Sequence, residues 1–387
     1  MTSMGRIAVP NDRTGTAPAR TTAASAVRAA VRPAIEAVEE LATEWRALAE
    51  RASEPNPFAE HWFVAASLPT MADQSDIRLI EVRRGGALIG LLPVEIFRGY
   101  ARLPVAIVHN WCHHHMFLGT PLIAAGEERA FWSATLALLD EAEWAPNLLH
   151  LRAFVEGGPV HLGLAAARPT AIVLREHRAL LDSTLTPEAY YEQAVRQKKR
   201  KEIRRLKNRL AELGDVRCHA LADRAALGAW CDAYLAMEAA GWKGKAGTAL
   251  VGDPRTARFF TDAVTAAFDA GRLQFLRLDL AGAPIAMLVN FLTPPGSFSF
   301  KTVFDEAYAR FSPGVLIQLE NLQILNDPAI AWMDSCAAED HPMIDGLWTE
   351  RRAIVRLTVR LAGARRGAVF AFCRALEKVS ALVRGRP

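Results

Sequence analysis

The sequence predicts an α+β protein of two similar lobes, each a mixed, mostly antiparallel sheet layered with helices. Runs of alternating apolar and polar residues, which are typical of strands, fall into two groups along the chain. In both groups the order is hairpin, third strand, turn, helix and strand, which indicates a repeat of architecture. The length of 387 residues also suffices for two domains of ordinary size.

Composition favours a globular protein in a reducing compartment. Apolar residues make up 51% of the chain, so a sizeable core can form, and no apolar run is long enough to predict a membrane-spanning helix. The five cysteines are scattered without a Cys-x-x-Cys pair, which argues against a disulfide framework or a structural zinc site. We therefore expect a cytoplasmic protein, with a peripheral position at the inner membrane as an alternative.

Positive charge is concentrated near the C-terminus. The net charge is +4, and the residues from Val355 onward contain eight Lys or Arg and one acidic residue. That tail contributes +7, so the remainder sums to about −3 by subtraction. Attraction of anions is therefore expected to be local, in the tail and in one basic helix.

The first half of the chain, residues 31–184, is predicted to form the N-terminal lobe. Residues 1–30 are rich in Ala, Thr and Arg, lack a hydrophobic segment and are expected to be disordered. Arg84-Gly85-Gly86 is a hairpin signal between two strands. Helices are expected at 34–52, 61–68, 127–143 and 159–166, and strands at 76–83, 87–97, 103–108, 148–154 and 171–174.

The second half, residues 185–362, is predicted to form a second lobe with the same order of elements. Residues 363–387 follow as a basic amphipathic helix. Helices are expected at 190–213, 224–240, 254–270 and 315–325, and strands at 273–280, 285–292, 297–304, 330–336 and 355–361.

Residues 297–322 are the most informative stretch of the second lobe. The alternation of aromatic and polar residues in 297–304 predicts a strand with one buried face. Ser312 suits the N-cap of the following helix, and Pro313 suits its first position. The unpaired N–H groups of a helix start suit a phosphate, although an ordinary strand–turn–helix connection has the same pattern.

Several short motifs of the second half form a set that resembles a known family. These are Arg209-Leu210-x-x-x-Gly214, Trp242-Lys243-Gly244, Gly282-x-Pro284-Ile285-Ala286, Phe304-Asp305-x-x-Tyr308-x-x-x-Ser312-Pro313-Gly314, and Met333-Asp334-Ser335 before Trp348. Residues 185–355 thereby resemble the GNAT-like acyltransferase domain of the CelD/BcsL family of bacterial cellulose biosynthesis proteins. The double arrangement is similar to aminoacyltransferases of the FemABX type, with the first lobe as a degenerate GNAT-like repeat.

The resemblance implies an N-acyltransferase that uses acyl-CoA, such as acetyl-CoA, and acts on an amine of a sugar or polysaccharide precursor. The Arg/Gln-x-x-Gly-x-Gly/Ala loop usual in GNAT proteins is absent, and residues 308–314 would stand in its place. An acyl-carrier protein or an aminoacyl-tRNA therefore stays open as the donor. A non-catalytic accessory or scaffold protein of a polysaccharide synthase is a further alternative.

Acyl transfer to an amine needs a proton acceptor and a donor to the developing oxyanion. Backbone N–H groups can serve the oxyanion if the strands at 297–304 and 330–336 part at their ends. Asp334, Asp305 and Glu238 are the candidate bases, with solvated or capping roles as the alternative for each. Asp334 is favoured because an acidic residue within an apolar strand needs an explanation.

The expected binding residues fall into two sets. The donor is expected along the central strand and the helix start, at Phe300, Thr302, Ser312, Pro313, Gly314 and Val315. The acceptor side is expected to include Trp242, Lys243, Lys199, Arg200, His341 and Trp348. Nine of the fourteen residues 196–209 are Lys or Arg, which suits either an anion clamp or a solvated helix face.

Other motifs carry weaker predictions. His113 and His115 alternate as metal ligands can, but no third ligand is nominated, so we expect a structural or rim-lining role and no metal. Ser335 and Cys336 suit a covalent intermediate, but the sequence places no base beside them. Few aromatic residues lie among the charges of 196–209, so nucleic acid is not an expected partner. The tail helix is expected either to lie on an anionic membrane surface or to dock on the protein.

Overall fold

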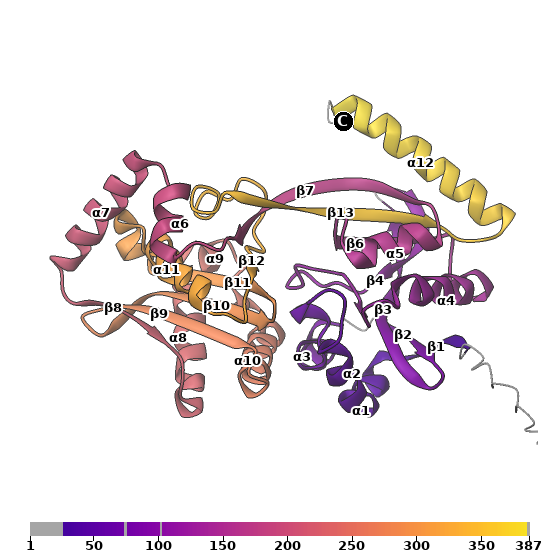
Figure 1. The fold of residues 1–387 in the computed structure, drawn as a ribbon, viewed down its shortest axis with the longest axis horizontal. Helices are drawn as coiled ribbons and strands as arrows, with labels where there is room; N and C mark the ends of the chain where they lie inside the picture. The colour runs from indigo at the N-terminus through magenta and orange to yellow at the C-terminus, as the bar shows by residue number, and fades with distance from the viewer. Residues whose placement is uncertain (1–25, 73–75, 101–102, 385–387) are drawn as a thin grey trace, which may run out of the picture.

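The computed structural model describes residues 26–72, 76–100 and 103–384, and Figure 1 shows the arrangement of its elements. The disorder expected at 1–30 therefore lies mostly outside the described residues. Residues 27–30 of this stretch, however, belong to a strand, β1, which starts at Val27. The mixed α+β class with a large sheet confirms the predicted fold class.

The described strands form one thirteen-stranded sheet in the order β1-β2-β3-β4-β6-β13-β7-β12-β11-β10-β9-β8, with β5 paired to β3. The strands are β1 (Val27–Pro33), β2 (Arg78–Arg84), β3 (Ala87–Tyr100), β4 (Leu103–Asn110), β5 (Leu122–Ile123), β6 (Leu148–Val155), β7 (Thr170–Asp182), β8 (Val216–Ala220), β9 (Leu273–Leu280), β10 (Ala283–Thr293), β11 (Gly296–Phe304), β12 (Trp332–Asp334) and β13 (Glu350–Arg360).

Helices connect many of these strands. The α-helices are α1 (Ala34–Glu40), α2 (Ala42–Ala49), α3 (His61–Met71), α4 (Glu128–Glu141), α5 (Pro159–Ala167), α6 (Pro187–Ala194), α7 (Gln197–Ala211), α8 (Leu227–Ala240), α9 (Trp242–Lys245), α10 (Pro254–Asp269), α11 (Pro313–Glu320) and α12 (Ala364–Arg384). The 3₁₀ helices are η1 (Pro57–Ala59), η2 (Arg224–Ala226), η3 (Leu250–Gly252), η4 (Glu306–Phe311) and η5 (Asn321–Asn326).

The two lobes repeat one topology. An edge strand, β1 or β8, is followed by helices and then by an antiparallel meander, β2–β4 or β9–β11. A helix, α4 or α11, then leads to a strand that pairs in parallel with the last strand of the meander, as β6 does with β4 and β12 does with β11. Two neighbouring parallel strands require a crossover connection such as this helix. Because each lobe has one such pair at the same place, the pairing of the strands shows that the topology is repeated.

Two long strands join the lobes into one sheet. In Figure 1, β7 and β13 run side by side across the molecule, and their residues pair antiparallel from Thr170 to Leu180. β7 also pairs with β12 of the second lobe, whereas β13 pairs with β6 of the first. The chain therefore returns to the first lobe after completing the second.

A shared aromatic core holds the lobes together on one face of the sheet. α3 packs against α10, and the rings of Phe63 and Phe259 lie 5.5 Å apart at that contact. Phe58 contacts Phe298 of β11 with ring centroids 5.9 Å apart. Such edge-to-face pairs add to the free energy gained by burial. The opposite faces of the two lobes have separate cores.

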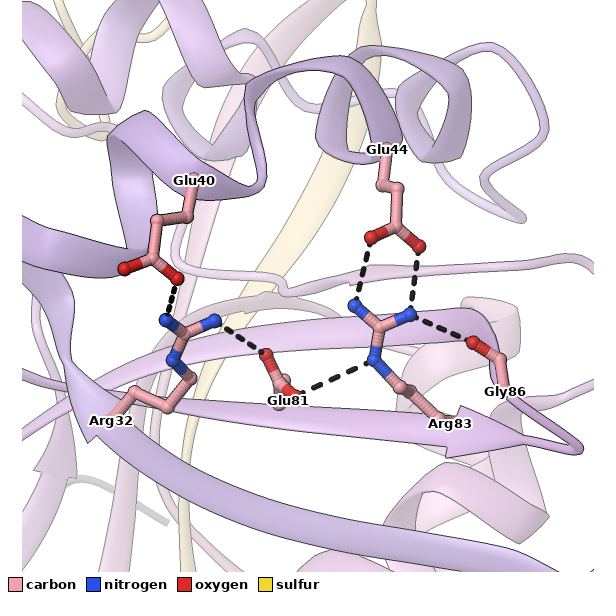
Figure 2. Close-up of polar contacts among 6 residues, drawn as sticks. All are labelled: Arg32, Glu40, Glu44, Glu81, Arg83 and Gly86. Atoms are coloured by element: carbon pink, nitrogen blue, oxygen red, sulfur yellow. Dashed lines mark hydrogen bonds and ion pairs between the residues drawn. The ribbon is translucent and has the colours of Figure 1, made fainter.

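Ion pairs fasten the first two helices to the edge of the sheet (Figure 2). Arg83 of β2 donates to both carboxylate oxygens of Glu44 of α2, at 2.7 and 2.9 Å. Arg32 of β1 pairs with Glu40 of α1, and Glu81 lies between the two arginines. Exposed ion pairs contribute little stability one by one, so we assign this network mainly an orienting role.

A buried carboxylate lies where the lobes meet. Glu60, just before α3, pairs with Arg272 at 3.4 Å and accepts a hydrogen bond from Trp62. Burial raises the pKa of Glu60 to about 7, against the opposing effect of the Arg272 charge. Glu60 therefore gains a negative charge in the folded protein only near neutral pH.

We expect Glu60→Gln to flatten the pH dependence of stability. The folded-state pKa lies above the unfolded value, so the folded protein binds more protons in between and loses stability as pH rises from about 4.5 to 7. The variant lacks this titration, so its loss of unfolding free energy between pH 4.5 and 8 should be smaller by roughly 3 kcal/mol. Urea unfolding at several pH values measures it, with Glu50→Gln, an exposed partner of Arg272, as control. Parallel profiles for the wild type and Glu60→Gln would contradict the prediction.

Several local predictions are corrected. The helix expected at 190–213 is broken at Val195 and Arg196 into α6 and α7, and the strand expected at 171–174 extends to Asp182 as β7. β8 was not expected. β11 is buried on both faces from Gly296 to Phe300 because helices cover both sides, so the expected single buried face is wrong.

The C-terminal helix α12 docks on the first lobe. Cys373 is buried against Tyr100, Ile107 and Leu148, while Phe372 remains 55% exposed. No helix within the described part of the chain is both long and apolar enough to span a bilayer.

Candidate functional site

The parallel strands β11 and β12 part after a short pairing. Their register runs from Gly296 opposite Trp332 to Phe298 opposite Asp334, and β12 ends there. Two residues later, Cys336 takes a left-handed backbone conformation with φ 52°, so the extended strand does not continue there. The carboxylate of Asp334 accepts the N–H of Cys336 at 2.8 Å and holds this turn.

A cavity of about 310 Å³ lies where the strands part. One wall is the rest of β11, and the opposite wall is the segment after β12. The lining residues are Phe117, Glu238, Gly241, Trp242, Lys243, Ser299, Phe300, Lys301, Thr302, Val303, Phe304, Gln318, Ser335, Cys336, Ala337, Ala338, His341, Met343 and Ile344. Both lobes contribute, because Phe117 comes from the first.

β11 has one more residue than its partner at this level. Val289 of β10 pairs with Lys301, and the next residue, Asn290, pairs with Ser299, so Phe300 is the extra residue of a bulge. A bulge bends a strand and leaves the extra residue outside the ladder of hydrogen bonds. Beyond Phe298, the other edge of β11 has no strand partner among the described residues.

Asp334 lies at the closed end of the gap between β11 and β12, where the two strands are still paired. It is fully buried and pairs with Arg178 of β7 at 3.5 Å and with Arg352 of β13 at 3.2 Å. Arg178 also donates to the carbonyl of Phe117 at 2.6 Å. Asp334 itself does not line the cavity. Its carboxylate therefore connects β12 to both bridging strands and, through Arg178, to the wall from the first lobe.

Glu238 is the candidate base that does line the cavity. Its buried carboxylate accepts hydrogen bonds from Nζ of Lys243 at 2.6 Å and from the N–H of Leu250 at 2.8 Å. Trp242, next to Lys243, is 60% exposed at the mouth. The start of α9 thus presents an aromatic ring and a paired ammonium to the cavity.

Asp305 lies outside the cavity lining. Its side chain accepts the N–H of Ala307 at 2.9 Å and caps η4. The structure thus brings one of the three carboxylates into the cavity and gives the other two hydrogen bonds that stabilise turns.

The start of α11 lies beside the cavity without lining it. Ser312 occupies the N-cap position but has φ 55° and makes no capping side-chain bond, so its expected capping role is wrong; its carbonyl instead accepts the N–H of Val315 at 2.9 Å. Pro313 is at the first helical position, as expected. A Cβ atom on Gly314 would come within 2.6 Å of Met343, which lines the cavity.

Of the remaining residues expected at the site, some line the cavity and others do not. Phe300, Thr302 and His341 line the cavity, and Gln318 donates to the hydroxyl of Thr302 at 3.3 Å. Trp348 is fully buried in the core of the second lobe. The side chain of Lys199 lies against Gly346, and burial lowers its pKa. Arg200 donates to the carbonyls of Glu192 and Val195, so it caps α6.

Lys301 is a charged cavity residue that the sequence did not lead us to predict. Its Nζ lies 3.1 Å from Nδ1 of His115, a residue of the first lobe. Burial and the nearby charge of Lys243 lower its pKa to about 8. A lysine in a strand that also contains Phe298, Phe300 and Phe304 is a signal that could have identified it.

In the first lobe, the corresponding gap is filled by the protein itself. The parallel pairing of β4 and β6 ends at His109 and His150. The amide of Asn110 then bridges the strands, because it accepts the N–H of Arg152 at 2.9 Å and donates to its carbonyl at 3.1 Å. It also donates to the carbonyl of Gly119 at 3.0 Å, which fixes the loop 111–119 across the gap. The same loop supplies His115 and Phe117 to the second lobe.

The histidines of this loop are in apolar surroundings. The ring of His113 stacks on Phe63, and that of His115 stacks on Phe259. Burial lowers the pKa of both, to about 3 for His113, so both are neutral at physiological pH. Within residues 26–72, 76–100 and 103–384, no group of three or more His, Cys, Asp or Glu residues is placed to hold a metal ion.

Strands that part around a cavity, in a lobe built twice in one chain, define a tandem GNAT-type fold. Residues 197–341 match the family model described as an acetyltransferase (GNAT) domain. This range contains Glu238, Lys243 and Lys301 and both parting strands. No curated protein matches the sequence.

Solved structures confirm the fold over most of the chain. FemX is similar with a TM-score of 0.55 at 10% identity, over 83% of this chain and 96% of that one. The C-terminal domain of a putative lysylphosphatidylglycerol synthetase from Agrobacterium fabrum has a TM-score of 0.53 at 13% identity, over 89% and 97%. A conserved protein of unknown function from Bacteroides thetaiotaomicron has 0.53 at 12%, over 84% and 97%. At these identities the likeness concerns the fold alone.

Proposed function

We propose that the second lobe is an acyl-CoA-dependent N-acyltransferase that acts on an amine of a sugar or polysaccharide precursor. The observation that carries the proposal is the parting of β11 and β12 around the cavity. Acyl-CoA would supply an activated thioester carbonyl at this place. The free edge of β11 suits an extended chain with amide groups, because such a chain can pair with a strand edge.

The chain's own residues meet the needs of amide formation. Unpaired N–H groups on the edge of β11 can donate to a developing oxyanion. We assign to Glu238 the acceptance of a proton from the acceptor amine, because it is the candidate base that lines the cavity. Burial and the nearby Asp334 charge hold the pKa of the Cys336 thiol well above its usual range, so the thiol stays protonated. Direct transfer to the amine is therefore favoured over an acyl-cysteine intermediate.

The positive charge near the donor side supports a phosphate-bearing donor. α7, whose outward residues are mostly Lys and Arg, packs against η4, directly before α11. The resemblance to the CelD/BcsL family supports a role in bacterial polysaccharide biosynthesis, such as that of cellulose. We also propose that α12 brings the protein to an anionic membrane surface, since Phe372 is exposed on a basic helix.

We expect acetyl-CoA to raise the melting temperature of the protein and Ala337→Trp to abolish this shift. A ligand at ~100 times its Kd adds about 2.7 kcal/mol of stability. Ala337 lines the cavity, so an indole there would fill it. Ala331→Trp is the control, since Ala331 is exposed and does not line the cavity. Differential scanning fluorimetry with millimolar acetyl-CoA measures both, and an unshifted wild-type protein would refute the acyl-CoA proposal.

Aminoacyl transfer from tRNA is the second candidate, favoured by the exposed basic face of α7 and the fold shared with FemX. It requires salt-dependent retention on RNA that is lost when residues 198–205 are neutralised. A non-catalytic scaffold would show neither RNA retention nor a shift with acetyl-CoA.

A further inference from the structure

Lys301 presents a cation to the cavity without an anionic partner. Its ammonium lies 3.1 Å from His115, 5.1 Å from the ring centre of Phe300 and 5.9 Å from that of Phe117. No carboxylate of the described residues lies within ion-pair distance of it. Half-buried charges are costly unless they are paired, so this arrangement needs an explanation.

The nearest acidic residue is already engaged. Glu238 pairs with Lys243 at 2.6 Å and also accepts the N–H of Leu250. Together Glu238, Lys243 and Lys301 have a net charge of +1 at the cavity wall when all three are ionised. The excess charge lies on Lys301.

His115 holds this lysine in place rather than neutralising it. Because the Lys301 ammonium donates to Nδ1, the ring proton of neutral His115 is on Nε2. Nε2 is buried and has no hydrogen-bond partner among the described residues. The ring is fixed in turn by its stacking on Phe259 of α10. Nδ1 of His115 is the acceptor of the pair, and the ammonium already uses it. The ammonium has further N–H groups that can donate, and Nε2–H has no acceptor among the described residues.

We propose that Lys301, positioned by His115 of the first lobe, binds an anionic group of the acceptor, a carboxylate or a phosphate carried beside the amine. This inference rests on the proposed transferase function and specifies the substrate class of the same cavity. A bound anion would complete the ion pair that the protein leaves open and would be held by a charge-assisted hydrogen bond. Glu238, which also lines the cavity, would interact with the positively charged end of the same molecule.

The inference gives the first lobe a role in specificity. Its own gap is filled by Asn110 and the loop 111–119, and that loop carries His115 and Phe117 to Lys301. A lobe without an open gap of its own thus completes the acceptor side of the other.

Three amino sugars test the proposal by isothermal titration calorimetry without acetyl-CoA. Glucosamine carries no anion, muramic acid adds a carboxylate and glucosamine 6-phosphate adds a phosphate. We expect at least one of the two anionic sugars to bind about tenfold or more tightly than glucosamine, the usual effect of a hydrogen bond to a charged group. The tighter of the two identifies the anion.

Variants assign the preference to Lys301. Lys301→Met should remove the preference for the anionic sugar, while Lys301→Arg should retain it. Lys245→Met is the matched control, because it removes one charge from an exposed pair with Glu306 outside the cavity. Thermal unfolding verifies the fold of each variant, and Lys301→Met should be no less stable, since it removes a desolvated charge.

The outcomes are distinct from those of the acetyl-CoA experiment. Any of three results overturns the inference. The wild type binds all three sugars with equal affinity, it binds neither anionic sugar, or Lys301→Met keeps the same preference as the wild type. Preferential binding of an anionic sugar that is lost in Lys301→Met supports the inference, even if acetyl-CoA does not raise the melting temperature. The absence of that thermal shift would refute only acyl-CoA as the donor.

Discussion

Replacing Asp334 with alanine is expected to destabilise the protein by about 3–5 kcal/mol, the usual cost of removing one partner of a buried ion pair. The substitution leaves Arg178 and Arg352 buried without their carboxylate, and it removes the hydrogen bond that holds the turn at Cys336. It also loosens Phe117, which Arg178 holds by its carbonyl. Urea denaturation measures the loss of unfolding free energy. The dependence of that free energy on urea concentration should be the same in the variant and the wild type.

Asp305→Ala provides the comparison for this result. Asp305 caps η4 by one hydrogen bond, so its loss should cost only about 1 kcal/mol. Asp334→Asn keeps the shape and an acceptor, and it should fall between the two. Equal losses of stability for Asp334→Ala and Asp305→Ala would show that the buried ion pairs contribute nothing. If an Asp334 variant instead had wild-type stability but no transferase activity, Asp334 would be the catalytic base.

Gly119→Ala is expected to destabilise the protein by about 3 kcal/mol or more. A Cβ atom at this position would lie 2.2 Å from the carbonyl oxygen of Arg152 and 2.3 Å from Nδ2 of Asn110. The oxygen belongs to a sheet backbone and cannot move away, so the loop must shift and the bonds of Asn110 must weaken. Chemical denaturation gives the change in unfolding free energy.

Gly228→Ala is the matched control for the same substitution. Gly228 lies in α8, and a Cβ atom there has no neighbour within 4 Å. Alanine is the better helix former, so this variant should be neutral or more stable by up to about 1 kcal/mol. If Gly119→Ala behaves like Gly228→Ala, the first-lobe gap is not closed as tightly as the contacts indicate. A folded Gly119→Ala protein should also bind anionic sugars less well, because its loop carries His115.

The candidate site shows what local pattern can predict. The strand that ends at Phe304, the helix after Pro313 and the acidic residue in the short strand at 332–334 were all placed from periodicity and turn residues. The sequence also predicts Glu238 and Lys243 as site residues, and the two lie together at the cavity. The sequence predicts Asp334 as a base but not its partners, because Arg178 and Arg352 come from strands whose pairing the sequence does not record.

By itself, the sequence determined the α+β class, the twofold repeat of elements and the approximate positions of the two strands that border the cavity. These depend on side-chain periodicity and on residues such as Pro313, whose preferences act over a few positions. The tertiary structure alone decided which of the two gaps stays open, how β13 returns to the first lobe, and what surrounds Lys301. His115 and Lys301 are 186 residues apart, and Asn110 fills its gap only because Arg152 and Gly119 meet it there. Contacts of that kind arise from packing between distant segments, so no local pattern could have predicted them.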